Sequence, residues 1–208
     1  MSYAKILEKV NRYYTAKLAE HGATARGVDW NSAESQRLRF QQLISVCDKR
    51  VPVSINDYGC GYGALADYLR EHGDSFQYCG FDISGPMIAR ARELHATMDE
   101  VVFVDDESSL APADYTIASG VFNVKNETPE AEWQEYVLHT LAALDRLSTK
   151  GFAFNALTKY SDPQFMRPDL YYADPLFYFD FCKVNFSRYV SLIHDYPLYE
   201  FTLKVRKD

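Results

Sequence analysis

Three closely spaced glycines lie where a short apolar run gives way to a helical pattern. The run Ile55-Asn-Asp57-Tyr is followed directly by Gly59-Cys-Gly61-Tyr-Gly63. Glycines at a strand-to-helix turn allow positive φ angles and let a ligand approach the backbone where a Cβ atom would intrude. The pattern therefore predicts a binding turn for a nucleotide-like ligand.

One acidic residue has the spacing that would complete such a site. The next predicted strand ends in Phe81-Asp82, and Asp82 follows Gly59 by 23 positions. At about this separation an acidic side chain can accept hydrogen bonds from both hydroxyl groups of a ribose. The turn and the acid together indicate a cofactor that contains adenosine.

Short strands alternate with helices through most of the chain. Helices are expected first over residues 3–18 and 31–47. From residue 53 the pattern predicts strands at 53–58, 78–82, 101–104, 115–119 and 151–157. Helices are expected near 63–72, 85–95 and 176–186. A further helix, after the fourth strand, has a buried stripe of Trp133, Val137, Leu141 and Leu144. Such alternation is typical of a parallel sheet with helices on both faces.

The chain is expected to end in two antiparallel strands, at 189–194 and 198–205. Only Asp195-Tyr196-Pro197 separates them, which is too short for a parallel crossover. The last strand alternates, with an apolar face and a polar face that carries Glu200, Thr202 and Lys204. We therefore predict an α/β fold in which a mainly parallel sheet contains one reversed strand.

The glycine pattern alone does not choose the cofactor, because Gly59, Gly61 and Ala64 also fit the dinucleotide pattern G-x-G-x-x-[G/A]. The reversed strand argues against NAD, and Asp57 would repel a pyrophosphate but suits a ligand with ammonium and sulfonium groups. S-adenosylmethionine (SAM) carries both charges and no phosphate. Two alternatives stay open: an NAD(P)-dependent oxidoreductase, and a non-catalytic protein that binds an adenosine ligand.

The motif D-x-G-x-G-x-G from Asp57 to Gly63, followed by Asp82, resembles the cofactor motifs of class I SAM-dependent methyltransferases. The similarity extends over about residues 53–205. It implies a Rossmann-like, seven-stranded, mostly parallel sheet with helices on both faces, an antiparallel C-terminal strand and preceding N-terminal helices. It also implies that a methyl group is transferred to an oxygen or nitrogen atom of a small molecule.

The resemblance further implies roles for residues of the glycine turn and the next strand. Asp57 and the backbone of Gly59, Cys60 and Gly61 would hold the methionine portion of SAM, and Asp82 would hold the ribose.

Further positions match the family's adenine and sulfonium contacts. Ile83 and Met87 would pack on the adenine, and Asp105 or Asp106 would meet its amino group. The sequence does not choose between these two aspartates, although we favour Asp106. Ser119 ends the strand that would pass beneath the sulfonium.

Two N-terminal features are candidates for further cofactor contacts. Arg39 would pair with the methionine carboxylate, or it is a solvated charge on its helix. Tyr13 or Tyr14 would place an aromatic face over the sulfonium, whose positive charge favours such a contact.

The acceptor side is expected in the loops beyond the carboxyl ends of the strands. The long segment 158–174 is predicted to shape this pocket, with candidate contacts Lys159, Tyr160, Arg167, Tyr171 and Tyr172. His194, beside Asp195, is a candidate general base. Adjacent residues of a strand point to opposite faces, which argues against Asp195 as the partner that orients this base. The other interpretation is a histidine at a strand end that bonds to the backbone.

Length and composition set the remaining expectations. The chain has 208 residues and a formal charge of −7, which suits one domain with a helical cap at 1–50 and a Rossmann-like core at 51–208. Without a basic face we expect no nucleic-acid or membrane partner. The four cysteines lack metal-ligand spacing, so we expect free thiols and no metal. The N-terminus has no signal-peptide pattern, and we expect a cytoplasmic protein.

Overall fold

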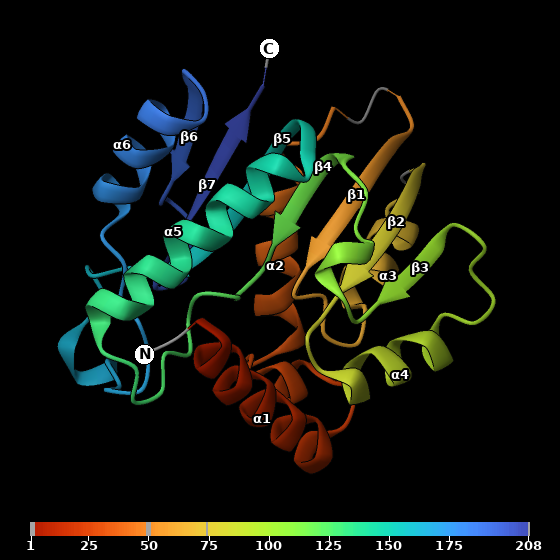
Figure 1. Ribbon diagram of the computed structural model, residues 1–208, viewed down its shortest axis with the longest axis horizontal. Helices are drawn as coiled ribbons and strands as arrows, with labels where there is room; N and C mark the ends of the chain where they lie inside the picture. Colours follow the sequence, from red (N-terminus) through yellow and green to blue (C-terminus); the bar gives the residue numbers. More distant parts are fainter. Residues whose placement is uncertain (1–2, 49–50, 74, 208) are drawn as a thin grey trace.

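A twisted seven-stranded sheet forms the centre of the computed structural model, which describes residues 3–48, 51–73 and 75–207 (Figure 1). The strand order is β3-β2-β1-β4-β5-β7-β6. The strands are β1 (Val53–Tyr58), β2 (Phe76–Phe81), β3 (Val101–Val104), β4 (Ala113–Ala118), β5 (Ser148–Leu157), β6 (Tyr189–Ile193) and β7 (Glu200–Arg206).

The direction of the strands confirms the predicted fold class. Strands β1 to β5 pair in parallel, whereas β7 is antiparallel to both β5 and β6. The reversed strand therefore lies inside the sheet, between two strands that run the other way.

Helices cover both faces of the sheet. The α-helices are α1 (Tyr3–His21), α2 (Ala33–Ile44), α3 (Ala64–Glu71), α4 (Gly85–Leu94), α5 (Glu130–Arg146) and α6 (Pro175–Asn185), and short 3-10 helices are η1 (Ala25–Val28), η2 (Glu107–Ser109) and η3 (Pro163–Phe165). The sequence predicts the α-helices to within a few residues but none of the 3-10 helices. Within the described ranges no helix has the length and apolar character needed to cross a membrane.

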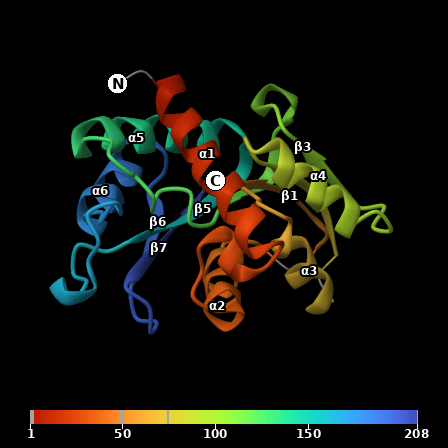
Figure 2. The same ribbon diagram turned by 90° about the horizontal axis from the view of Figure 1, so that it is seen from below.

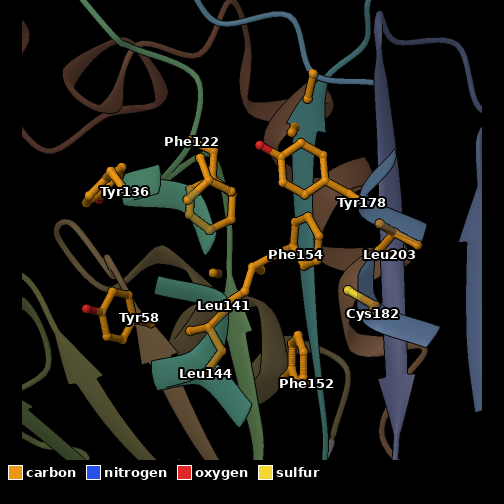
Figure 3. Close-up of a cluster of buried hydrophobic side chains, with 14 of the residues drawn as sticks. Tyr58, Phe122, Tyr136, Leu141, Leu144, Phe152, Phe154, Tyr178, Cys182 and Leu203 are labelled. Atoms are coloured by element: carbon orange, nitrogen blue, oxygen red, sulfur yellow. The ribbon is translucent and has the colours of Figure 1, made fainter. Parts of the chain in front are cut away.

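The core on the α5 side forms because α5 has an apolar stripe at helical spacing. Leu141 and Leu144 are fully buried and lie against β5, which contributes Phe152 and Phe154 (Figure 3). Phe122, which follows β4, meets Phe154 edge-on with ring centroids 5.5 Å apart. This packing fixes the ends of β4 and β5, where the candidate site begins.

Helix α1 crosses the end of the sheet at which β1 and β4 finish (Figures 1 and 2). Near its start, Tyr3 packs on Tyr136 of α5 with ring centroids 5.6 Å apart. Further along, Thr15 Oγ1 shares a 2.8 Å hydrogen bond with Ser84 Oγ at the start of α4. The helix thus spans the carboxyl edge of the sheet from α5 to α4.

Ser84 provides a test of this attachment. Its buried Oγ bonds to Thr15 and also accepts the Met87 N–H as the N-cap of α4. We expect Ser84→Ala to lower the free energy of unfolding by about 1–2 kcal/mol, because both bonds are lost. Ser32→Ala removes the cap of α2 and a local contact with Glu34 but no contact with another helix that the structure shows, and it is the matched reference. Urea denaturation measures both, and equal losses in the two variants would argue against the link to α1.

Candidate functional site

A cavity of about 280 Å³ lies at the carboxyl ends of β1 to β4 and is covered by α1. Within the sheet, β2 and β3 lie on one side of β1, and β4 and β5 lie on its other side. Loops therefore diverge between β1 and β4, and in open α/β sheets ligands bind in the crevice at this point.

The glycine turn between β1 and α3 lies against the cavity. Gly59 and Gly61 have φ angles of 82° and 56°, in the left-handed region that favours glycine. A Cβ atom on Gly59 would lie 2.6 Å from a methyl carbon of Val121, and one on Gly61 would lie 2.8 Å from a methyl carbon of Val28. Both positions thus require glycine for conformation and for space.

Asp82 follows β2 and holds the glycine turn in place. Its Oδ2 accepts a hydrogen bond from Gly61 N–H at 2.9 Å, and its Oδ1 accepts one from Ser84 N–H at 2.8 Å. A carboxylate has about four acceptor positions, so further lone pairs are available to a ligand. Removal from water raises the pKa of Asp82, and the two N–H bonds act in the opposite direction.

Asp57, at the end of β1, is nearly inaccessible to water, with 3% of its surface exposed. Burial raises the pKa of Asp57 to about 7, although a 2.6 Å hydrogen bond from Tyr78 Oη opposes this shift. The charge on this carboxyl group therefore changes near neutral pH.

Every predicted cofactor-binding residue except Arg39 lines the cavity. Those not yet described are Cys60, Ile83, Met87, Asp105, Asp106 and Ser119. Asp106 also caps η2, because its Oδ1 accepts the Ser108 N–H at 2.9 Å, and this bond lowers its pKa. Both aspartates lie at the same end of the cavity, after β3.

Arg39 lies outside the cavity lining and is also not a solvated charge. It is only 7% exposed, and its Nε and Nη2 donate hydrogen bonds to the carboxylate of Glu200. Its guanidinium carbon lies 3.9 Å from the ring centroid of Trp30, which lines the cavity. Arg39 Nη1 is buried and has no hydrogen-bond partner.

The N-terminal part of the chain contributes cavity residues that sequence reasoning largely missed. They come from α1, the end of η1, the segment after it, and α2, and they are Leu7, Val10, Asn11, Tyr14, Val28, Trp30, Gln36 and Phe40. Of the two candidate tyrosines, Tyr14 lines the cavity, whereas Tyr13 Oη donates to Asp29 at 2.8 Å. The sequence predicted an N-terminal helical cap and a tyrosine at the cofactor, but not the other residues of this part that line the cavity.

The segment 158–174 does not contribute to the cavity lining. Its backbone bonds instead to the loop after β4, through Asn126 N–H to Asp169 O and Tyr171 N–H to Asn123 O. The structure therefore does not place this segment in the lining of the cavity, because α1 occupies the carboxyl edge. Its predicted contact with the methyl acceptor stays a prediction.

His194 is exposed at the end of β6, the edge strand, and it too lies outside the cavity lining. Strands β7, β5 and β4 separate β6 from β1. The nearest aromatic ring is that of Tyr160, with centroids 6.0 Å apart. The structure therefore does not bring His194 together with the glycine turn.

The charged side chains that line the cavity are all acidic. They are Asp57, Asp82, Asp105, Asp106 and Glu107. The lining contains no lysine, arginine or histidine among the residues that the structure describes. This charge pattern suits a cationic ligand and opposes a phosphate.

Comparison with known proteins agrees with this chemistry. Residues 57–147 match the family described as "Methyltransferase domain". The chain is 47% identical over 156 residues to Rv1506c of Mycobacterium tuberculosis, a protein named as a methyltransferase, and covers 94% of it. It is 28% identical over 151 residues to the malonyl-[acyl-carrier protein] O-methyltransferase of Pseudescherichia vulneris, of which it covers 56%.

Solved structures share the fold at low sequence identity. A complex of DhpI with SAM and HEP has a TM-score of 0.64 and 15% identity, and the match covers 96% of this chain and 97% of that one. The mycolic acid cyclopropane synthase CmaA1, in complex with SAH and CTAB, has a TM-score of 0.57 and 13% identity over 76% of this chain and 64% of that one.

The fold and the relatives together define the class: the chain belongs to the class I SAM-dependent methyltransferases. SAM is accordingly its cofactor and methyl donor. This membership decides against an NAD(P)-dependent oxidoreductase and against a non-catalytic adenosine-binding protein.

Proposed function

We propose that this methyltransferase binds SAM in the cavity under α1 and methylates an oxygen or nitrogen atom of a small molecule without net negative charge. One observation carries the proposal. Asp57 and Asp82, at the ends of the neighbouring strands β1 and β2, flank a glycine turn whose backbone faces a cavity with only acidic charged groups.

Two buried polar atoms support the fit of the cofactor. Ser119 Oγ, beside the cavity, and Arg39 Nη1, behind Trp30, have no hydrogen-bond partner. A buried donor without a partner costs free energy, so such groups usually meet a ligand or water. The methionine carboxylate of SAM is the acceptor that Arg39 Nη1 would bond.

The other cavity residues would orient the cofactor. Asp57 would hold its ammonium group, Asp82 its ribose hydroxyls, and Asp105 or Asp106 its adenine amino group, while Ile83 and Met87 would pack on the adenine. Bound SAM supplies a methyl group on a sulfonium, which is already a good leaving group. The chain therefore needs mainly to align the reactants and exclude water.

Tyr14 and Trp30 support this role for the covering segment. Both line the cavity, and both come from the N-terminal part that closes over the strand ends. Their rings would exclude water above the Ser119–Gly120 turn and place aromatic faces near a positive charge.

The charge of the cavity supports the proposed acceptor class. A carboxylate or phosphate acceptor would meet the acidic side chains that the cofactor leaves, Glu107 and one of Asp105 and Asp106, and no basic one among the described lining residues. An alcohol or an amine avoids this repulsion.

A matched acceptor panel tests this proposal. Purified protein and SAM are incubated with benzyl alcohol, benzylamine and benzoate, and with aliphatic sets of the same three types, and S-adenosylhomocysteine (SAH) is measured. We expect turnover with alcohols or amines and none with carboxylates. Turnover confined to the carboxylates would refute the acceptor class.

Asp57 gives the cofactor site a predictable pH dependence. Its carboxylate form is needed to hold an ammonium group, and its pKa in the empty site is about 7. Protons therefore compete with the ligand at low pH, and we expect the affinity for SAH to fall about tenfold from pH 8 to pH 6.

Calorimetry across this pH range measures the effect. Asp57→Asn should remove the dependence, and Tyr78→Phe should move it to higher pH, because the Tyr78 hydrogen bond lowers the pKa of Asp57. A pH profile that is the same in wild type and Asp57→Asn would exclude Asp57 as its origin.

A further inference from the structure

A buried ion pair joins α2 to the last strand of the sheet. Arg39 and Glu200 have side chains only 8% and 1% exposed, and Nε of Arg39 lies 2.9 Å from both carboxylate oxygens of Glu200. Nη2 donates a further hydrogen bond to the same carboxylate. Because buried charges are costly unless they are paired and hydrogen-bonded, this geometry holds both side chains in one orientation.

Glu200 also connects to the turn at the cavity. Its Oε2 accepts a hydrogen bond from Asn155 Nδ2 at 2.6 Å, and Asn155 Oδ1 accepts the Gly120 N–H at 2.8 Å. A Cβ atom on Gly120 would overlap the ring of Trp30, so the indole lies directly against this glycine. Trp30 in turn lies under the Arg39 guanidinium, which closes a ring of contacts.

The reversed direction of β7 is what places Glu200 there. Glu200 is the first residue of β7 and pairs with Leu157, the last residue of β5. Because β7 runs against β5, its beginning lies at the carboxyl edge of the parallel strands, next to the cavity.

We propose that Glu200 is a positioning residue for the cofactor. Through Arg39 it leaves Nη1 as the one guanidinium nitrogen without a hydrogen-bond partner, beside the cavity residue Trp30, and through Asn155 it holds the Gly120 turn. The inference rests on the proposed function, in which Arg39 Nη1 bonds the methionine carboxylate.

A positioning role and a purely electrostatic role predict opposite results for Glu200→Gln. The negative charge of Glu200 repels the ligand carboxylate, so its removal alone would tighten binding. Loss of positioning weakens binding instead, because the long arginine side chain is no longer held by its carboxylate partner and must be ordered by the ligand.

Two ligands separate this role from a general effect on the fold. SAH carries the amino acid portion, whereas 5′-methylthioadenosine has the same adenosine and sulfur without it. Calorimetry compares both ligands on wild type, Glu200→Gln, Arg39→Gln and the double variant, with melting curves for each. Glu71→Gln is the matched control, because Glu71 pairs with Arg37 of α2 on the exposed surface.

We expect Glu200→Gln to weaken SAH about tenfold and to change 5′-methylthioadenosine by less than about twofold. The double variant should bind SAH no more weakly than Arg39→Gln, since Glu200 acts through Arg39. The double variant also replaces the ion pair by two neutral amides, so that no charge is left buried without its partner. If Glu200→Gln alone does not fold, the comparison of the double variant with Arg39→Gln therefore still tests whether Glu200 acts through Arg39.

The outcomes are separable. Unchanged or tighter SAH binding in Glu200→Gln, or an equal loss of both ligands, would overturn the positioning role while leaving Arg39 in place. Normal SAH binding by Arg39→Gln would instead overturn the assigned role of Arg39 and this inference with it. Failure of wild type to bind either ligand would refute the cofactor cavity itself.

Discussion

Gly61→Val is expected to weaken the binding of SAH by about 100-fold or more, the largest effect among the variants considered. The new Cβ atom would lie 2.8 Å from Val28, at a backbone φ of 56° that valine does not readily adopt. The clash would separate the glycine turn from the segment that covers it. It would also displace the Gly61 N–H from Asp82.

Gly73→Val is the matched control for this experiment. Gly73 has a similar φ of 69°, but a Cβ atom there has nothing within 4 Å. The Gly73→Val variant has the same kind of backbone strain as Gly61→Val but no steric clash. The affinity of this variant for SAH should therefore stay within about twofold of wild type. Calorimetric titration measures both variants, and near wild-type affinity in Gly61→Val would place the ligand elsewhere.

Asp82→Ala is expected to weaken both SAH and 5′-methylthioadenosine, because both ligands carry the ribose. Loss of hydrogen bonds to a carboxylate costs about 1.5–3 kcal/mol, or roughly 10- to 100-fold in affinity. The variant also loses the hydrogen bonds that Asp82 accepts from the N–H groups of Gly61 and Ser84, which adds to the effect.

The contrast between ligands makes the Asp82 prediction specific. Arg39→Gln should reduce the affinity for SAH alone, whereas Asp82→Ala should reduce both affinities by similar factors. Asp180→Ala, on the exposed side of α6, is the control. If Asp82→Ala bound 5′-methylthioadenosine as wild type does, Asp82 would not be the ribose ligand.

The glycine turn and its acidic partner could be predicted because their signals are local. Gly59 and Gly61 require a backbone conformation that other residues adopt poorly, and the distance to Asp82 is set by one strand-helix-strand unit. The final hairpin was predictable for a similar reason, since three residues cannot form a parallel crossover.

The partners of these elements could not be read from the sequence. Glu200 alternates with apolar residues and was expected on a polar face, yet it is 1% exposed. Both faces of β7 are covered, because α2 and α6 both pack against this strand. Arg39 and Glu200 are 161 positions apart, and nothing local indicates that they meet.

Helix α1 shows the same limit of local patterns. Its apolar positions predict a buried face, but the periodicity of a helix does not say which surface it buries. The predicted helical cap and the candidate tyrosines placed this helix near the cofactor, but the residues by which it lines the cavity, among them Leu7, Val10 and Asn11, could not be read from the sequence. The contact of Thr15 with Ser84, which fixes this placement, joins residues 69 positions apart.

A crystal structure of the protein with SAH tests the central claim most directly. We expect the ribose hydroxyls at Asp82, the adenine between Ile83 and Met87, and the homocysteine carboxylate at Arg39 Nη1. SAH bound anywhere other than the cavity under α1, or an empty cavity in crystals grown with saturating SAH, would contradict the account.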